Sequence, residues 1–427
     1  MKQKIVLLAF MICSISIYAN DKLVIDIDKS ISMAKENNID LKRAELTLDG
    51  KRRAKATAYN VFYPSVSGFL ILNRSNTEPA QGSDTNFLLG YEASLNFTPA
   101  LFNAITLLKK DYEMGVITYE QAEKKIEKTV KELFYNLIIL NEQISLLEDN
   151  LKNIKSRYDL TKLNYDAGLV SELELLKVQV SYQNFIPELN NLKNLYNSST
   201  MNFKTILGID LNKTIELSGQ IDPEIKKITF EEAYDLAVMN NDQLKMVYKS
   251  SELLNAQKKT VFSQGFLPLL TAKYSSSTLL NDPFGSDRFD TDNFLDDMGE
   301  LSVSMFYSFD SLFPNSAERL SLEEIDRSIT DADLQGKALL DGLKLQITNL
   351  IATLNNSLEI QEGLELTVLL AKKSLDSTEQ AYKSGTSKLL EVESAQNEYK
   401  KARLELLTEK YKYINSLLEL EDICGEL

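Results

Sequence analysis

The strongest constraint on this chain is that its two halves carry the same landmarks in the same order. A Tyr-x-x-Gly motif that ends at Gly168 is followed by Glu174 and Gln179, and the same residue types recur 217 positions later around Gly385. Three more landmarks recur with small gaps: an Asn-Asn pair, an aromatic-x-Pro step and a phenylalanine-rich segment. Four landmarks in one order indicate an internal duplication. We place its two structural repeats at 20–220 and 221–427.

The repeats follow a segment, 1–19, with the pattern of a secretory signal peptide. Lys2 and Lys4 give it a basic start, a short apolar stretch follows, and Ala19 suits the position before a cleavage site. The apolar stretch is shorter than the roughly 20 residues that a membrane-spanning helix needs. We therefore predict an exported protein whose mature chain begins near Asn20.

Each half also contains a long stretch in which every third or fourth residue falls on one stripe. In the first half this stripe is almost wholly apolar and comprises Val130, Leu133, Leu137, Leu140, Ile144, Leu147, Leu151, Ile154, Tyr158, Thr161 and Tyr165. Spacings that alternate between three and four are typical of a left-handed coiled coil. The matching stripe of the second half carries Ser357, Gln361 and Thr378, so we expect it to face a wetter neighbour.

These stripes predict two long antiparallel helical hairpins, at 103–207 and 314–422, each preceded by short helices. Pro314 suits the first turn of a helix. The glycine of each Tyr-x-x-Gly motif suits the position just after a helix end, which would place both glycines at the hairpin tips. Ser171 and Ser387 are expected to cap the two returning helices.

Between the short and the long helices, alternating sequences predict two strand hairpins, at 65–99 and 269–309, with four strands in all. The clearest strand has Leu301, Val303 and Met305 on one face and mostly serine on the other. The first strand of each hairpin shows no such alternation, so the pattern assigns it no face.

Two interpretations fit these strands. They could form a sheet of a soluble sandwich, or they could belong to a transmembrane β-barrel, in which strands of about 9–11 residues have one apolar face. Four strands cannot close a barrel, and an open sheet edge is not tolerated in lipid. The membrane interpretation therefore requires several chains to contribute strands to one barrel.

The composition removes several classes of function. The chain contains no histidine, and removal of the signal would leave Cys424 as the one cysteine. This excludes an intrachain disulfide in the mature protein, Ser-His-Asp and Cys-His nucleophiles, and most zinc sites. A net charge of −15 argues against nucleic acid as a partner. Because no phosphate loop or cofactor fingerprint is present, we predict that the protein is not an enzyme and uses no cofactor or metal.

The order of short helices, an aromatic-x-Pro entry into a strand hairpin, long coiled coils and Tyr-x-x-Gly tips resembles the TolC-like outer-membrane efflux protein family, in both halves of the chain. The resemblance implies an α+β membrane protein that is a homotrimer. Its long helices would form an α-barrel in the periplasm, and four strands from each protomer would form a transmembrane β-barrel in outer-membrane lipid. It also implies a passive exit duct of a tripartite efflux pump or type I secretion system, partnered by a periplasmic adaptor and an inner-membrane pump.

The resemblance further assigns roles to residues at the tips. The adaptor would dock at two tripeptides, which are Ala167, Gly168 and Leu169 in the first half and Ser384, Gly385 and Thr386 in the second. Glu391 falls at an acidic gate position of the family, Glu174 at the matching place in the first half, and Tyr382 completes the predicted periplasmic gate. The chain departs from the family at Ser387 and Ser394, where an arginine and a second acid often lie. Plain helix turns and solvated glutamates are the alternative interpretations.

Two other functions compete with the channel. A soluble periplasmic coiled-coil adaptor would share the helical hairpins, but adaptors usually carry one hairpin inserted into domains rich in Gly and Val. An enzyme with a carboxylate site such as Glu174 and Glu391 would need a concave globular core. We interpret the acidic segment 282–297 as a solvated loop rather than a calcium site, because it lacks the glycine and terminal glutamate of an EF-hand loop.

Overall fold

The computed structural model describes residues 23–74, 85–219, 228–281 and 299–425. The predicted signal peptide 1–19 and the acidic segment 282–297 lie outside these residues. The chain divides into two compact units, and each of them combines segments from both sequence halves. The hairpin unit comprises 1–44, 120–241 and 341–427, and the sheet unit comprises 45–119 and 242–340.

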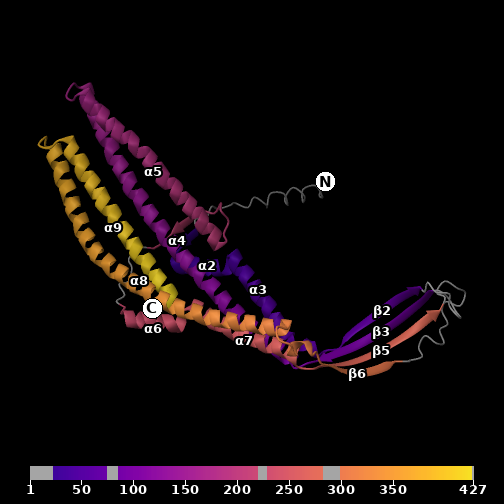
Figure 1. Cartoon of the computed structure of the whole chain (residues 1–427). Helices are drawn as coiled ribbons and strands as arrows, with labels where there is room; N and C mark the ends of the chain where they lie inside the picture. Colours follow the sequence, from indigo (N-terminus) through magenta and orange to yellow (C-terminus); the bar gives the residue numbers. More distant parts are fainter. Residues whose placement is uncertain (1–22, 75–84, 220–227, 282–298, 426–427) are drawn as a thin grey trace, which may run out of the picture. The chain divides into compact units, whose positions relative to one another are not determined.

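The first half of the chain contains β1 (Leu23–Ile25), α2 (Ile27–Asn37), α3 (Ile39–Ala56), a 3-10 helix (Ala58–Phe62), β2 (Ser65–Arg74), β3 (Thr85–Phe97), α4 (Ala100–Asp166), α5 (Glu172–Leu207) and β4 (Ile215–Leu217). The second half contains α6 (Phe230–Asn240), α7 (Asp242–Phe266), β5 (Leu269–Asn281), β6 (Glu300–Phe306), a 3-10 helix (Asp310–Leu312), α8 (Ala317–Lys383) and α9 (Leu389–Cys424). Figure 1 labels these elements.

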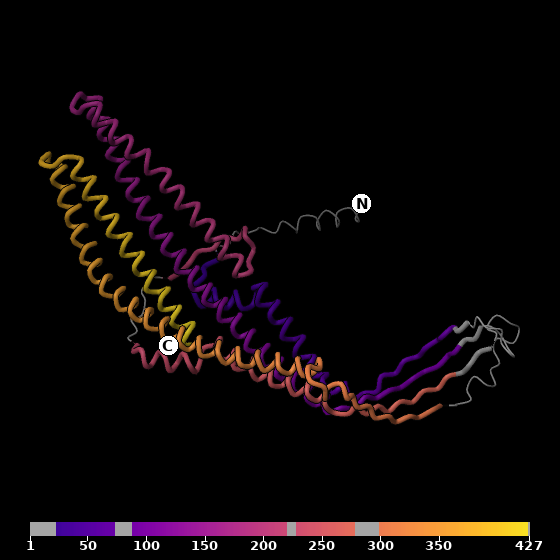
Figure 2. Tube along the Cα trace, in the orientation of Figure 1, coloured from indigo at the N-terminus to yellow at the C-terminus, as the bar shows by residue number. Residues whose placement is uncertain are grey.

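Three of the four pairs of corresponding helices have equal lengths, the exception being α3 with 18 residues and α7 with 25. The long helices α4 and α8 have 67 residues each, and the returning helices α5 and α9 have 36 each. The short helices α2 and α6 have 11 residues each. In Figure 2 each long helix and its returning helix run antiparallel to one another as a hairpin, purple in the first half and orange to yellow in the second. No helix in the described ranges is both long and apolar enough to cross a bilayer.

The core of the hairpin unit forms where the first hairpin meets the short elements that precede and follow it. β1 pairs in parallel with β4, which puts Ile25 beside the buried side chains of Val130, Phe134 and Phe203. Farther along the first hairpin, Ile144, Leu147 and Leu189 form a smaller apolar cluster between α4 and α5. The apolar stripe on α4 therefore packs within its own hairpin, and in the larger cluster it also packs with Ile414 and Leu418 of α9.

The stripe on α8 differs from the prediction that it faces a wet neighbour. Ser357 is fully buried and donates to the carbonyl of Glu409 on α9 at 3.3 Å, and Gln361 donates to the Ser357 hydroxyl at 3.3 Å. The prediction was wrong because these polar side chains satisfy one another and the backbone inside the second hairpin. Such hydrogen bonds allow polar groups in a dry seam.

Two helix starts also differ from the predictions. The helix α8 begins at Ala317, and Pro314 lies before it, ahead of Asn315, whose φ is 61°. The Ser316 hydroxyl accepts from the Arg319 N–H at 3.3 Å, so the cap follows the proline. At α9 the N-cap is Lys388 rather than Ser387, and the Ser387 hydroxyl is used elsewhere. Ser171, by contrast, does cap α5, as predicted.

The sheet unit contains a four-stranded antiparallel sheet in the order β2-β3-β5-β6. On β6, Leu301, Val303 and Met305 are 71%, 74% and 67% exposed, whereas the intervening Ser302 and Ser304 are partly buried. The apolar face of this strand therefore points outward in the single chain.

The pairing register settles the faces of the strands that the sequence pattern left unassigned. Leu301 pairs with Tyr274, Tyr274 with Ala93, and Ala93 with Val66, so all four share the apolar face. On β2, Leu70 lies on that face by alternation from Val66.

The opposite face of the sheet is mostly polar. It carries an ion pair between Lys273 and Glu92 at 2.8 Å and a hydroxyl pair between Ser65 and Ser94 at 2.8 Å. Phe69 also points to this face, where it covers Gly90: a Cβ on Gly90 would meet the phenyl ring at 2.6 Å.

The C-terminal end of α5 needs a glycine, Gly208, for a steric reason that does not apply to the glycines at the hairpin tips. Gly208 has φ of +66°, and a Cβ there would lie 2.6 Å from the backbone oxygen of Asn37. Gly385, at the second tip, has φ of +75° but open space around it. Both backbones are strained for any other residue, but only Gly208 is also closely packed.

We predict that Gly208→Ala destabilises the protein more than Gly385→Ala. Both variants incur the left-handed backbone cost of roughly 1–2 kcal/mol, and Gly208→Ala must also displace α2. Thermal unfolding followed by circular dichroism should show the lower midpoint for Gly208→Ala. Equal midpoints for the two variants would contradict the packing of Asn37 against Gly208.

Candidate functional site

The tip of the first hairpin is a tight helix stop built by a left-handed glycine. Gly168, with φ of +72°, donates its N–H to the carbonyl of Tyr165 at 2.9 Å. Leu169 donates to the carbonyl of Asn164 at 2.8 Å, which completes a Schellman motif. Ala167, Gly168 and Leu169 are all exposed, and Leu169 is 75% exposed. This tip therefore presents a small apolar surface.

The second tip repeats the backbone of the first but carries hydroxyl groups. Gly385 donates to the carbonyl of Tyr382 and Thr386 to that of Ala381, both at 2.9 Å. The hydroxyls of Ser384 and Thr386 also donate to the Ala381 carbonyl, at 2.9 and 3.0 Å. The two tips thus share one backbone geometry and differ in surface chemistry.

The predicted gate residues lie in the first turns behind these tips. Glu391 is exposed, accepts a hydrogen bond from the Ser387 hydroxyl, and accepts a longer one from the Lys388 N–H at 3.4 Å. The Ser387 hydrogen bond, followed by the Lys388 N–H, lowers the pKa of Glu391 below its ordinary value. Ser387 stands where the family often has an arginine, and here it stabilises the ionised glutamate.

Glu174 and Tyr382 occupy different settings from Glu391. Glu174 lies in the first turn of α5, partly buried, and its N–H donates to the Ser171 hydroxyl at 3.3 Å. Tyr382 is partly buried at the end of α8 and supports the second tip through its carbonyl. Within the chain, therefore, the structure brings Tyr382 and Glu391 to the end of one hairpin and places Glu174 at the end of the other.

A contact between the two hairpins, behind their tips, was not predicted from the sequence. Gln396 of α9 donates to the side-chain oxygen of Asn150 on α4 at 3.1 Å, and both residues are buried. Nearby on α4, the terminal nitrogens of Arg157 are buried without a hydrogen-bond partner in the described part of the chain. Burial lowers the pKa of Arg157, and the negative charges of Glu393 and Glu379 oppose that shift. The heptad spacing of Asn150 and Arg157 was the available signal.

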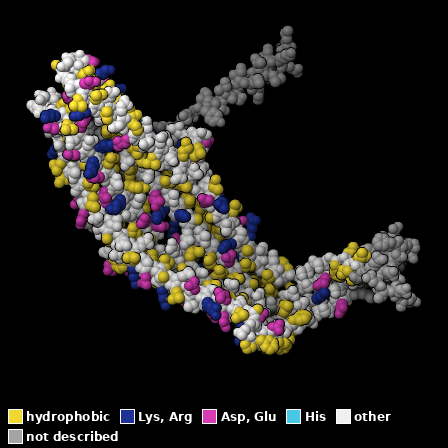
Figure 3. All heavy atoms as spheres, turned by 45° about the horizontal axis from the view of Figure 1, so that its top comes forward, with side chains coloured by type: hydrophobic (Ala, Val, Ile, Leu, Met, Phe, Trp, Pro, Cys, Tyr) yellow, Lys and Arg dark blue, Asp and Glu magenta, His cyan; other side chains and the backbone are white. Residues whose placement is uncertain are grey.

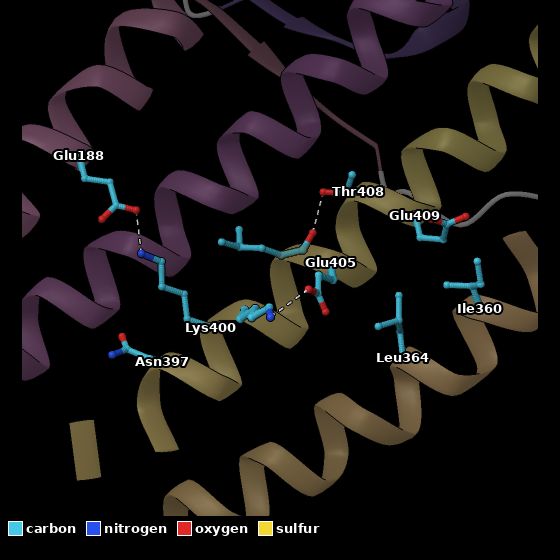
Figure 4. Close-up of a pocket in the computed structure, with 10 residues that line it drawn as sticks. Glu188, Ile360, Leu364, Asn397, Lys400, Glu405, Thr408 and Glu409 are labelled. Carbon is cyan, nitrogen blue, oxygen red and sulfur yellow. Dashed lines mark hydrogen bonds and ion pairs between the residues drawn. The ribbon is translucent and has the colours of Figure 1, made fainter. Parts of the chain in front are cut away.

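An open groove of about 640 Å³ lies along α5, α8 and α9. Lys400 reaches across it to Glu188, with 2.7 Å between ammonium and carboxylate, as Figure 4 shows. The Lys400 ammonium also lies 4.6 Å from the ring centre of Phe185, and Ile360 and Leu364 supply apolar lining. These side chains pair with one another and hold the hairpins together.

Charged side chains on the helices are interspersed in sign, as the face in Figure 3 shows. Many of them form ion pairs, such as Lys193 with Glu148 at 2.6 Å and Lys128 with Asp422 at 3.1 Å. Within the described residues, no cluster of His, Cys, Asp and Glu side chains has the arrangement of a metal site.

Helical hairpins with left-handed glycine tips, joined to an antiparallel sheet, define a fold of the TolC type. Residues 30–209 match the family model described as outer membrane efflux protein. The outer membrane protein TolC of Escherichia coli is 19% identical over 347 residues, which cover 78% of this chain and 69% of TolC.

Two solved structures share the fold. The CmeC outer membrane channel of Campylobacter jejuni matches with a TM-score of 0.79 at 15% identity, over 93% of this chain and 85% of CmeC. The open state of the MtrE outer membrane channel of Neisseria gonorrhoeae matches with a TM-score of 0.72 at 14% identity, over 94% of this chain and 89% of MtrE. Residues 30–209 thus match an outer membrane efflux protein family, and the predicted resemblance to the TolC-like proteins is confirmed.

Proposed function

We propose that this protein is the outer-membrane exit duct of a tripartite efflux pump or a type I secretion system. It conducts substrates passively from the periplasm to the outside. The main support for the proposal is which face of the sheet is exposed. On β6, Leu301, Val303 and Met305 are exposed, and the serines between them are partly buried. A contiguous exposed apolar face of this kind marks contact with lipid or with protein, and the family match supports lipid.

The sheet can become a barrel only by joining other copies of the chain. The edge strands are β2 and β6, and the antiparallel alternation makes them run in opposite directions. The β6 strand of one copy can therefore pair antiparallel with the β2 strand of the next, and a ring of copies leaves no edge exposed to lipid. A homotrimer would give a twelve-stranded barrel from the four strands of each chain.

The long helices leave apolar side chains uncovered that neighbouring copies would bury. Leu163 on α4 is 67% exposed, and Leu366 and Leu370 on α8 are 57% and 56% exposed. In the proposed trimer these side chains pack between protomers, and the hairpins close into an α-barrel in the periplasm. Each sequence repeat, 20–220 and 221–427, would supply one strand hairpin and one helical hairpin.

The hairpin tips are the proposed docking sites of a periplasmic adaptor, which would link the duct to an inner-membrane pump. Ala167, Gly168 and Leu169 offer an apolar contact, and Ser384, Gly385 and Thr386 offer hydroxyls. The open space around both glycines admits a partner backbone.

Replacing Gly385 with tryptophan should abolish cross-linking to the adaptor, because the bulky side chain would fill that open space. Unchanged cross-linking would remove the second tip from the docking site.

The soluble-adaptor alternative is not supported. It predicts a single hairpin inserted into other domains, whereas this chain has two hairpins of equal length and a sheet with its apolar face exposed. The family is one of channels, which also gives no support to the carboxylate-enzyme alternative.

A pair of adjacent substitutions tests the barrel. Val303→Lys places a charge on the lipid-facing side, at a cost of about 2–4 kcal/mol near the bilayer centre, whereas Ser304→Lys faces the interior. We expect channels in planar lipid bilayers from the wild type and Ser304→Lys, and strongly reduced insertion of Val303→Lys. Equal insertion of both variants, or no conductance from the wild type, would contradict the proposal.

Glu391 is the proposed gate residue with the clearest test, since copies of it from three chains would form an acidic ring that attracts cations. Glu391→Gln should lower the cation selectivity of the channel and weaken block by divalent cations. Glu188→Gln is the control, because Glu188 is paired with Lys400 between the hairpins. Unchanged selectivity in Glu391→Gln would contradict the proposed acidic ring. Glu174 and Tyr382 would then be the remaining gate residues to test.

The same residue predicts a pH dependence. Because the Ser387 hydrogen bond lowers the pKa of Glu391, the wild type should keep its Glu391-dependent selectivity down to a lower pH than a variant without that hydrogen bond. In Ser387→Ala the pKa rises, so the loss should begin at higher pH. Channel recordings over a pH series would show coincident profiles if Ser387 had no such effect.

A further inference from the structure

A small open pocket lies in the sheet unit, close to where the helices meet the sheet. It has a volume of about 370 Å³ and is bounded by α4, α7 and α8. Its lining includes Lys258, Lys259 and Phe262 of α7, Asn103 of α4 and Leu322 of α8. The pocket, which we call the junction pocket, therefore combines cationic and apolar side chains.

Hydrogen bonds between α4 and α7 build one wall of the junction pocket. The side-chain nitrogen of Asn103 donates to the Ser263 hydroxyl at 2.7 Å and to the Lys259 carbonyl at 3.2 Å. Ser263 is buried, and its hydroxyl donates to the same carbonyl at 2.8 Å. These bonds fix the backbone from which the Lys259 side chain extends.

The two lysines of the junction pocket differ in their partners. The Lys258 ammonium forms an ion pair with Asp326 of α8. Lys259 is exposed, and no carboxylate in the described part of the chain forms an ion pair with it. The nearest preceding acid on α7, Glu252, is paired with Lys110 of α4 at 2.8 Å. The pocket therefore has one positive charge that is left for an external anion.

Along α7, the charged and the aromatic side chains follow one another toward the sheet. Lys259 is followed by Phe262 and then by Phe266, the last residue of the helix, and β5 begins at Leu269. The rings of Phe262 and Phe266 are stacked with their centres 5.1 Å apart, and Phe262 is 47% exposed. At 1.5 Å per residue, Lys259 lies about 10 Å before the end of α7. The cation is thus farther from the sheet than the aromatic stack.

The helix α7 separates apolar from polar side chains, as the sheet does. At roughly 100° per residue, Phe262 and Phe266 lie on one face, and the exposed Gln257 and Gln264 lie on the opposite face. Ser263, which contacts α4, lies between them. Because Phe262 lines the junction pocket, the pocket opens on the aromatic face of the helix.

Other aromatic side chains lie at the same junction on the apolar side of the sheet. Phe97 is on the apolar face by alternation from Ala93, and its ring packs edge-on against Phe102 of α4 with the centres 6.0 Å apart. Further exposed aromatic residues at the junction are Tyr63, Phe309 and Phe313. Figure 3 shows hydrophobic side chains gathered where the helices meet the sheet. Aromatic belts of this kind lie at the boundary between the lipid core and the headgroups.

We propose that the junction pocket binds an anionic glycerophospholipid of the periplasmic leaflet. Lys259 attracts the phosphate, and Phe262 and Phe266 pack against the glycerol and the first methylene groups of an acyl chain. The lipid then has its phosphate and its acyl chains in the same order as the cation and the aromatic stack. The headgroup layer is roughly 5–8 Å thick, and a lysine side chain can extend to reach it.

An anionic lipid is favoured over a zwitterionic one because the one carboxylate beside the pocket, Asp326, is already paired with Lys258. The positive end of a zwitterionic headgroup therefore has no free partner there among the described residues. This proposal rests on the proposed function, which places the junction at the periplasmic boundary of the bilayer.

The test uses the absence of tryptophan from the chain, because a single introduced tryptophan then reports only on its own surroundings. Phe262→Trp keeps an aromatic ring in the junction pocket, and Val303→Trp reports on the apolar face of the sheet. Each purified protein is reconstituted into phosphatidylcholine vesicles that contain increasing fractions of brominated phosphatidylglycerol or brominated phosphatidylcholine. Bromine quenches tryptophan fluorescence on contact, so the quenching measures which lipid occupies the pocket.

Phe262→Trp should show about a fivefold preference for phosphatidylglycerol over phosphatidylcholine, which is the effect of one lysine near an anionic headgroup. Adding Lys259→Gln should remove this preference. Adding Lys337→Gln, the matched control, should leave it unchanged, because Lys337 is also exposed but lies farther from the sheet along α8. Equal quenching by the two lipids, or a preference that survives Lys259→Gln, would overturn the proposal.

Val303→Trp separates this proposal from the proposed function. Its quenching by both lipids shows that the sheet lies in the bilayer. If Phe262→Trp is then quenched by neither lipid, another protein surface covers the junction pocket, and the lipid site alone is refuted. Absence of quenching at Val303→Trp contradicts the barrel itself, and the lipid site with it.

Discussion

The four-stranded sheet exposes one apolar face, which is unfavourable in water, and two open edges, which are unfavourable in lipid. In water, the face formed by residues such as Leu301 and Val303 would drive association. In lipid, the unpaired backbone groups of β2 and β6 would cost several kcal/mol each. Pairing these two edges between copies bonds the open backbone groups and closes a barrel whose apolar outer face can lie in lipid. An oligomer with one shared barrel follows from this requirement, and the family resemblance suggests that the number of copies is three.

The likeness of the two halves of the chain fits the predicted duplication and bears on how one chain meets that requirement. Each half supplies a strand hairpin and a helical hairpin, and the corresponding helices have kept equal lengths of 67 and 36 residues. The tips have kept the same left-handed glycine and the same two backbone hydrogen bonds. What differs is the side-chain chemistry: one tip is apolar and the other carries hydroxyls. The Glu391 carboxylate accepts a hydrogen bond from the Ser387 hydroxyl, whereas Glu174 is bonded to the Ser171 hydroxyl through its backbone N–H. The two halves of the chain, alike in backbone, can therefore make different contacts.

Much of this fold could be predicted from the sequence because its signals are periodic and local. The stripe of Val130 and Leu137, the Tyr-x-x-Gly tips and the Ser171 cap depend only on neighbours in the sequence. The predictions that failed concerned residues whose surroundings are set by contacts between segments far apart in the sequence. Ser357 and Gln361 looked solvated until α9 supplied an acceptor, and the face of Phe69 was settled only by pairing with β3. Pro314 was misplaced because Asn315 turns the chain before the helix begins. Of the candidate site, the tips and Glu391 could be located, but Arg157 could not, since its importance depends on the second hairpin.

The most direct test of this account is the mass of the purified protein in detergent, measured by light scattering and corrected for bound detergent. The account predicts a particle close to three times the mass of one chain that precipitates when the detergent is removed. A monomer that stays soluble without detergent would contradict it. The exposed face of the sheet would then have to be covered within one chain, and the shared barrel would be lost.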